Sequence, residues 1–147
     1  MKLQVRDVVS YAGRDYIVEG VVTYQSGGKA TQLARAADGD LVLWIEPPRD
    51  DSGDRLLILN EIRDLEMSVP PPESISYHEL TYVRRFSGRA SIEVSGQVPE
   101  RTAGTVQIWR YRAAGDLFLQ IEEGAGRVSM LAGESVHRGM IDVLPGR

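Results

Sequence analysis

The chain has 147 residues, 42% of them hydrophobic and 26% charged, which is typical of one globular domain. It has no cysteine, which excludes disulfides, thiolate metal sites and thiol catalysis, and its net charge of −4 leaves no basic excess for binding phosphates. No apolar run reaches the roughly 18 residues of a membrane span. Residues 1–7 lack the apolar core of a signal peptide. We therefore expect a cytoplasmic protein without membrane insertion.

In chain order, the first half predicts short β-strands separated by turns. Two β-rich runs at residues 8–11 and 15–24 flank a glycine-containing connection, which predicts a hairpin. A weaker strand is predicted at 31–35. The clearest strand, 41–46, follows the turn signal Asp38-Gly39 and ends at two prolines, which cannot donate to a strand ladder.

The strand 41–46 has two alternating sets of side chains. Its odd-numbered residues are aliphatic, so we expect Leu41, Leu43 and Ile45 to face the core. The equivalent residues of the strand 116–122 are Leu117, Leu119 and Ile121, and we expect them to be buried as well.

The first half ends with a charged loop and a strand, and a proline-rich stretch separates it from the second half. The acidic residues of the loop 49–54 lack the spacing and the closing glutamate of a calcium loop. A strand follows at 55–59, and residues 61–67 are ambiguous between a strand and a helical turn. Three consecutive prolines predict a stiff linker over 69–75.

The second half repeats the plan of the first. Its predicted strands are 80–86, 91–94, 105–112, 116–123, 127–131 and 140–144, with a turn at Ser87-Gly88. No window has a 3.6-residue hydrophobic period of helical length, so the predicted class is all-β.

A shared motif relates the halves. Residues 39–46, Gly-Asp-Leu-Val-Leu-Trp-Ile-Glu, recur 76 positions later as Gly-Asp-Leu-Phe-Leu-Gln-Ile-Glu, and the same offset pairs Gly20 with Gly96. We interpret this as an internal duplication, with a first β-repeat at 1–68, a Pro-rich linker at 69–75 and a second β-repeat at 76–147. A half-size unit buries little apolar area, so we expect one compact domain sharing a core. One barrel, a sandwich and two small barrels all fit.

The sequence offers few catalytic or metal-binding patterns. The two histidines, His78 and His137, have no metal-ligand spacing, and neither a phosphate loop nor a nucleophile elbow occurs. We therefore expect no metal, no cofactor and no catalytic residue. Glu46 and Glu122 end the equivalent strands of the two halves. They are interpreted as solvated strand ends or, alternatively, as the acid/base pair of an enzyme.

The strand 105–112 is the best candidate for a binding surface. Alternation places Trp109 and Tyr111 on the face opposite to the aliphatic residues, so they are exposed if the aliphatic face forms the core. Exposed aromatics and arginines are favoured contact residues. If the aromatic face is the core, the surface vanishes. The candidate binding residues are Trp109, Arg110, Tyr111, Arg84 and Arg85.

Several segments resemble one bacterial family. Residues 88–99, Tyr111, residues 119–122 and Gly133 are similar to the family catalogued as domain of unknown function 4178, and residues 7–20 look like its opening. The resemblance covers nearly the whole chain. It implies no established activity and no catalytic residue. Members of that family often sit in gene clusters with a small membrane protein and a spermidine-synthase-like enzyme, which implies an accessory role.

These observations favour a non-enzymatic accessory module that binds a protein partner, or an anionic small ligand, on one β-face. One alternative is an enzyme with Glu46 and Glu122 as paired carboxylates. Another is a β-barrel that binds single-stranded nucleic acid through Trp109, Tyr111 and nearby arginines. The acidic charge balance disfavours nucleic acid.

Overall fold

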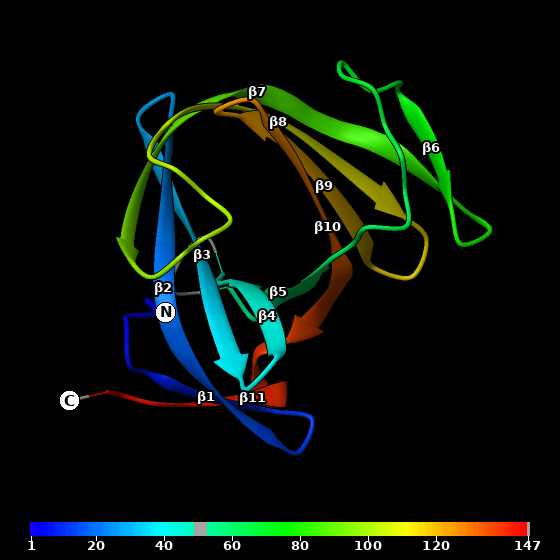
Figure 1. Ribbon diagram of the computed structural model, residues 1–147. Helices are drawn as coiled ribbons and strands as arrows, with labels where there is room; N and C mark the ends of the chain where they lie inside the picture. Colours follow the sequence, from blue (N-terminus) through cyan, green and yellow to red (C-terminus); the bar gives the residue numbers. More distant parts are fainter. Residues whose placement is uncertain (49–52, 147) are drawn as a thin grey trace.

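The computed structural model describes residues 1–48 and 53–146. These residues form eleven strands in one antiparallel sheet, together with a short 3-10 helix, η1, at Arg138–Met140 (Figure 1). The strands are β1 (Val8–Tyr11), β2 (Arg14–Ser26), β3 (Lys29–Asp38), β4 (Leu41–Glu46), β5 (Arg55–Glu61), β6 (Ser74–Tyr77), β7 (Leu80–Gly96), β8 (Gly104–Ala113), β9 (Leu117–Gly124), β10 (Arg127–His137) and β11 (Ile141–Leu144).

Eight of the strands in the described residues close into a barrel. Their order is β2-β3-β4-β5-β10-β9-β8-β7, and β7 pairs back onto β2. Each neighbouring pair is antiparallel, and Figure 1 looks into one opening. Strands β1 and β11 extend the sheet beyond β2, and β6 extends it beyond β7. The all-β prediction is confirmed, and the arrangement is a barrel with additional strands.

Two long strands allow the barrel to close. β2 pairs with β1 through its first residues and with β7 through its last, and β7 pairs with β6 and then with β2 in the same way. At the seam Gly20 lies opposite Gly96. A Cβ at Gly20 would lie 2.6 Å from the Gln97 carbonyl oxygen, and Gly96 has a φ of +73°, so both positions favour glycine.

The predicted turn at Ser87-Gly88 is wrong. β7 runs unbroken from Leu80 to Gly96, with a register shift between Arg84 and Phe86 against β8. The small Gly88 leaves room for the Phe86 ring, because a Cβ there would lie 3.0 Å from its Cζ atom. The glycine therefore serves packing within the strand and does not end it.

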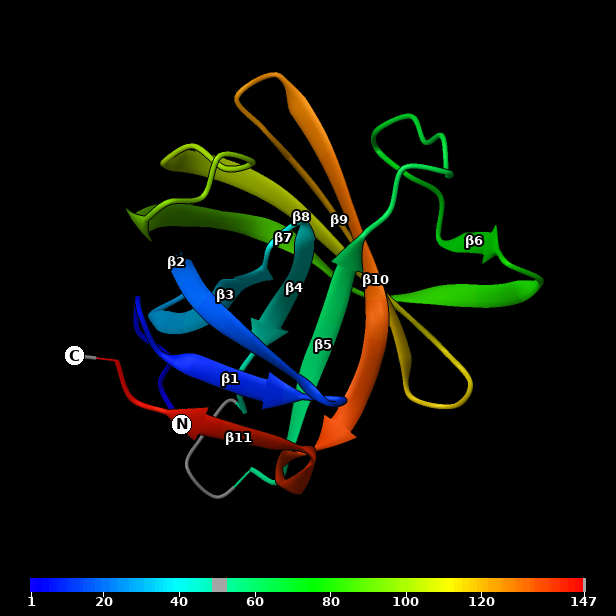
Figure 2. The same cartoon turned by 60° about the horizontal axis from the view of Figure 1, so that its bottom comes forward.

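The described residues form three apolar cores, since both faces of many barrel strands are covered. The lumen of the barrel contains Val22, Leu33, Trp44, Leu59, Ile92, Val106 and Leu131 among others. The first outer core lies on β2–β5 beneath β1 and β11, which run side by side in Figure 2, and includes Val9, Val18, Leu43, Ile45, Ile58 and Ile141. The second outer core lies on β8 and β9 beneath β6 and residues 62–73, and includes Ile75, Tyr82, Trp109, Tyr111, Leu119 and Ile121.

Of the three core residues predicted on β4, Leu43 and Ile45 are buried, but the prediction for Leu41 is wrong. Leu43 and Ile45 are buried in the first outer core as expected, and Trp44 on the opposite face is also buried, in the lumen. Leu41 is 45% exposed because it begins the strand directly after the Gly39 turn, where the cover ends. Of the corresponding residues on β9, Leu119 and Ile121 are fully buried and Leu117 is half-buried.

The predicted linker 69–75 is a packed segment. Val69 packs against the second outer core, and the Pro72 carbonyl accepts a hydrogen bond of 2.7 Å from the Tyr111 hydroxyl. Its last residues, from Ser74, already belong to β6. The proline-rich stretch therefore covers one face of the barrel.

Candidate functional site

A chain of polar side chains crosses the barrel lumen. Arg110 of β8 donates to Glu46 of β4, with an Nη1–Oε2 distance of 3.0 Å, and to Gln120 of β9, with an Nε–Oε1 distance of 2.9 Å. Gln120 in turn donates from Nε2 to Glu122 Oε2 over 2.6 Å. Glu46 and Glu122 are therefore connected through an arginine and an amide.

The two-residue period of the strands puts these groups inside. On β9, Gln120 and Glu122 alternate with Leu119 and Ile121, which belong to the second outer core. The side chains of Glu122 and Glu46 are only 3% and 14% exposed. The expectation that both glutamates are solvated strand ends is wrong, because the closed barrel places this face in its interior.

Glu122 lies at the centre of the polar chain. Its two carboxylate oxygens accept hydrogen bonds of 3.0 and 2.9 Å from the Tyr24 hydroxyl, and Arg101 Nε lies 3.2 Å from Oε1. Burial raises the pKa of Tyr24 well above its ordinary value, and the negative charge of Glu122 raises it further. The phenol therefore stays protonated and donates to the carboxylate across the physiological range.

Arg101 balances the charge of Glu122. Burial acts to lower the pKa of its guanidinium, but the attraction of the Glu122 carboxylate and the hydrogen bond to it outweigh burial, so the pKa lies above its ordinary value. The side chains of Arg101 and Glu122 are only 5% and 3% exposed. The lumen thus contains a buried ion pair beside a second, partly buried pair between Arg110 and Glu46.

This arrangement does not resemble an acid/base pair. General acid/base catalysis needs a proton donor and a proton acceptor that reach the substrate. Each glutamate here faces its own arginine, and the cavity that borders Glu122 has a volume of about 20 Å³, close to the size of one water molecule. Glu46 borders a surface groove near Pro47, but both of its oxygens bind Arg110.

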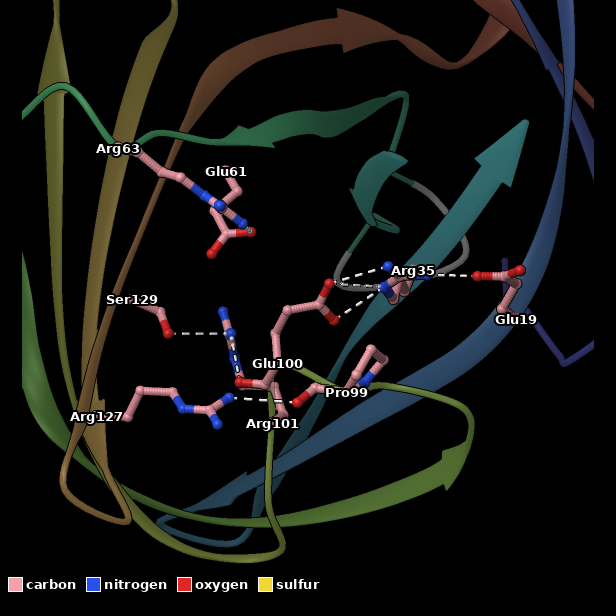
Figure 3. Close-up of polar contacts among 9 residues, drawn as sticks. All are labelled: Glu19, Arg35, Glu61, Arg63, Pro99, Glu100, Arg101, Arg127 and Ser129. Atoms are coloured by element: carbon pink, nitrogen blue, oxygen red, sulfur yellow. Dashed lines mark hydrogen bonds and ion pairs between the residues drawn. The ribbon is translucent and has the colours of Figure 1, made fainter. Parts of the chain in front are cut away.

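The connection between β7 and β8, residues 97–103, passes across part of one barrel mouth (Figure 1) and carries two charged side chains inward. Glu100 accepts from Arg35 of β3, with an Nε–Oε1 distance of 2.9 Å, and Arg35 also pairs with Glu19 of β2 (Figure 3). Arg101 follows Glu100 and reaches the lumen. Two ion-pair contacts therefore hold this connection against the barrel.

An open cleft of about 450 Å³ lies at the same mouth, and we call it the mouth cleft. It is bounded by the end of β5, the start of β10 and the β7–β8 connection, and its lining includes Glu61, Arg63, Glu100, Arg127, Ser129 and Met130. Figure 3 shows Glu61 and Arg63 across a gap from Glu100 and Arg127. The cleft therefore presents two arginines and two carboxylates to one opening.

The predicted aromatic surface is buried. Trp109 and Tyr111 are 6% and 0% exposed and belong to the second outer core. Of the two alternatives that the alternation left open, the aromatic face forms the core, so the expectation of exposed anchors is wrong. The physical reason is the cover formed by β6 and residues 62–73, which the sequence could not place on this face.

Of the other candidate residues, only Arg84 lies beside these aromatics, opposite Tyr111 in the β7–β8 ladder. Arg110 points the opposite way, into the lumen. Arg84 forms an ion pair of 3.3 Å with Glu73, and the exposed Arg85 borders a shallow groove with Arg112. The five candidates therefore lie in three different environments.

Sequence reasoning missed the residues that form the mouth cleft. Glu100 belongs to a connection without a regular pattern, Arg63 follows the end of β5, and Arg127 begins β10, far away in the chain. The only sequence feature near this region was the pair Glu46 and Glu122, which end equivalent strands. Their side chains lie in the lumen and do not line the mouth cleft.

The described residues offer no cluster of metal ligands. Across residues 1–48 and 53–146, no group of three or more histidine or acidic side chains could hold a metal ion. His78 lies 2.9 Å from Asp64, and His137 accepts from the Gly139 backbone N–H at the start of η1. Residues 49–52 of the acidic loop lie outside the described residues.

The chain matches one known protein family. The model of the family described as Domain of unknown function (DUF4178) matches residues 4–138. The chain belongs to this family. The resemblance predicted from the sequence is thereby confirmed, and the DUF4178 match includes all eight barrel strands.

Two further comparisons gave no match. No curated protein matches the chain. No solved structure matches it. In the described part of this DUF4178 protein, no helix has the length and apolar character needed to cross a membrane.

Proposed function

We propose that this DUF4178 protein is a non-enzymatic binding module and that its mouth cleft binds an anionic group, such as a carboxylate of a protein partner or of a small ligand. The observation that carries the proposal is the presence of two incompletely engaged arginines, Arg63 and Arg127, on one open cleft.

These arginines have donors to spare. A guanidinium has five N–H donors. In the described part of the chain, Arg63 contacts Glu61 at 3.5 Å, which is long for a hydrogen bond, and Arg127 donates to the Pro99 carbonyl over 3.3 Å. The side chain of Arg63 is 85% exposed. Both can therefore turn toward an incoming oxygen without breaking a buried contact.

The lining also limits which anion fits. Glu61 and Glu100 place negative charge beside the two arginines, and Ile62 and Met130 add apolar surface. A carboxylate on an aliphatic stem suits this mixture, whereas a highly charged phosphate chain meets repulsion from the glutamates. With Trp109 and Tyr111 buried, the aromatic residues invoked for binding nucleic acid do not reach a surface.

The test is an NMR titration with sodium glutarate and, separately, with acetyl-glutamate amide, at constant ionic strength against sodium chloride. We expect saturable shifts confined to residues 61–63, 97–103 and 127–130. An Arg63→Gln/Arg127→Gln variant should lose them. The control variant, Arg14→Gln/Arg89→Gln, changes the net charge equally at exposed sites away from the cleft and should keep them. Equal shifts in both variants, or no saturable shift in the parent protein, would refute the proposal.

The partner remains a prediction. The family resemblance implies a small membrane protein or a spermidine-synthase-like enzyme, and an acidic segment of either is a candidate source of the carboxylate. The paired-carboxylate enzyme is the weaker alternative, because Arg101 and Arg110 each neutralise one of the two glutamates.

The internal duplication also remains our interpretation. It is supported by the sheet order, in which β1–β5 and β6–β10 occupy equivalent places and join through the β2–β7 and β5–β10 pairs. The pairing of Gly20 with Gly96 at the seam agrees with the offset of the shared motif.

A further inference from the structure

The side chain of Arg101 occupies a site with the features of a guanidinium receptor. Its guanidinium carbon lies 5.1 Å from the centroid of the Trp44 ring, within the range of a cation–π contact. Nε lies 3.2 Å from Glu122 Oε1. Nη1 donates to Ser129 Oγ over 3.2 Å and to the Glu100 carbonyl over 3.1 Å.

The walls of this site are independent of the segment that supplies the cation. Trp44, Glu122 and Ser129 come from the barrel strands β4, β9 and β10. Tyr24 and Gln120, also on barrel strands, hold the Glu122 carboxylate in place. Arg101 comes from the β7–β8 connection, so the barrel forms the receptor and the connection supplies the occupant.

The occupant does not satisfy the site completely. In the described residues, the buried side-chain donors without an acceptor are Arg101 Nη2 and Trp44 Nε1. Buried donors are nearly always paired, and the Arg101 side chain is only 5% exposed. A cavity of about 20 Å³ borders Arg101, Glu122 and Ser129. Arg101 therefore fits the receptor loosely for a permanent structural group.

We propose that the lumen contains a guanidinium-binding site whose resident occupant is Arg101, and that an external alkylguanidinium takes its place when the β7–β8 connection moves outward. The ligand is a planar cation on a slim alkyl stem, either a small molecule or the arginine side chain of a partner. This inference does not rest on the proposed function, because the mouth cleft binds an anion through Arg63 and Arg127.

The Arg35–Glu100 pair gives a way to loosen the connection without touching the receptor. Arg35 binds Glu100 through Nε and Nη2, each at 2.9 Å. Because Arg35 lies directly opposite Trp44 on the neighbouring strand, the pair is better broken from the side of Glu100, whose carboxylate is not part of the receptor. A Glu100→Gln substitution should therefore raise the affinity for the external cation while leaving Trp44, Glu122 and Ser129 intact.

The experiment uses Trp44 fluorescence in a Trp109→Phe background, so that one tryptophan reports on the site. Arg101→Ala protein is titrated with ethylguanidinium chloride in the millimolar range against sodium chloride. We expect a saturable response at least about tenfold tighter than in the parent protein, where Arg101 competes. Adding Glu122→Gln should abolish it. Arg55→Ala, which removes an exposed arginine remote from tryptophan, should not create it.

Two further measurements complete the test: one covers the case in which Arg101→Ala does not fold, and the other distinguishes a partner arginine from a small cation. If Arg101→Ala does not fold alone, recovery of a cooperative thermal transition by ethylguanidinium supports the site, and no recovery overturns it. In Glu100→Gln protein, acetyl-Gly-Arg-Gly amide is compared with ethylguanidinium. Binding of the peptide supports a partner arginine as the source, and binding of ethylguanidinium alone supports a small cation. The absence of a saturable response to both in Arg101→Ala, or an equal response after Glu122→Gln, would overturn the proposal.

Discussion

The barrel lumen and the second outer core are both buried, but they are built from different chemistry. The second outer core is apolar, and its polar tip, the Tyr111 hydroxyl, is bonded to the Pro72 carbonyl. The lumen encloses two arginine–glutamate pairs among aliphatic side chains. Well-packed apolar residues often stabilise a fold more than buried ion pairs do. The second outer core therefore stabilises the protein mainly through apolar packing, whereas the lumen combines an apolar core with charged groups, and we propose that these groups recognise a ligand.

Breaking the charge balance of the lumen should have the largest effect. Glu122→Leu leaves Arg101 without its carboxylate and removes the acceptor of Tyr24, so we expect the free energy of unfolding to fall by about 3–5 kcal/mol. Urea unfolding measures it. The double variant Arg101→Met/Glu122→Leu should be more stable than Glu122→Leu alone. If the loss in the double variant equals the sum of the losses in Glu122→Leu and Arg101→Met, the two residues of the ion pair are not energetically coupled.

In the second outer core, size should matter instead of charge. Trp109→Ala leaves a cavity and should lower the free energy of unfolding by about 3 kcal/mol, with little dependence on salt. Trp109→Phe keeps most of the volume and should cost less than about 1.5 kcal/mol. Both values come from urea unfolding at low and high salt. A Trp109→Ala protein as stable as the parent would show that this side chain does not support the core.

The strand alternation predicted the class and several core positions, because a two-residue period reports which side chains share a face. It identified Leu43 and Ile45 correctly. It could not show that Trp44 on the other face is also buried, since alternation of this kind indicates one buried and one solvated face per strand. The closed barrel with covers on its outside leaves β4 with two buried faces.

The candidate site was harder to predict for a related reason. Trp109 and Tyr111 look like contact residues only if their face is open, and the segment that covers them lies about 40 residues earlier in the chain. Arg101 reaches Trp44 and Glu122 from a connection without periodicity. Contacts between distant segments follow from barrel closure, and local sequence pattern does not encode them.

A smaller effect is expected where the cover meets the outer core. Tyr111→Phe keeps the ring but removes the hydroxyl that donates to the Pro72 carbonyl over 2.7 Å. We expect a loss of about 1 kcal/mol in the free energy of unfolding. Hydrogen exchange should rise in residues 62–73 and stay unchanged in the lumen strands. An equal rise across the barrel would mean that this bond does not specifically hold the cover.

The smallest expected effect concerns how the free energy of unfolding changes at alkaline pH through one tyrosine in the lumen, Tyr24, and one near the surface, Tyr77. Burial, followed by the charge of Glu122, raises the pKa of Tyr24 well above 10, and burial with the Asp64 hydrogen bond raises the pKa of Tyr77 to about 12. Both pKa values are higher in the folded than in the unfolded chain, so the unfolded chain loses these protons first. The stability they contribute is complete below about pH 10 and is lost as the pH rises through the folded values.

Both Tyr24→Phe and Tyr77→Phe should therefore flatten the decline of unfolding free energy above about pH 10, measured by urea unfolding, and Tyr24→Phe should do so more above about pH 12, where Tyr77 ionises in the folded chain. The reason is that Tyr24 faces a buried carboxylate, whereas Tyr77 faces the exposed Asp64. Absorbance at 295 nm should show one fewer late-ionising phenol in each variant. An unchanged pH dependence in Tyr24→Phe would contradict a phenol bound to Glu122, and with it the hydrogen bond that positions this carboxylate for a guanidinium.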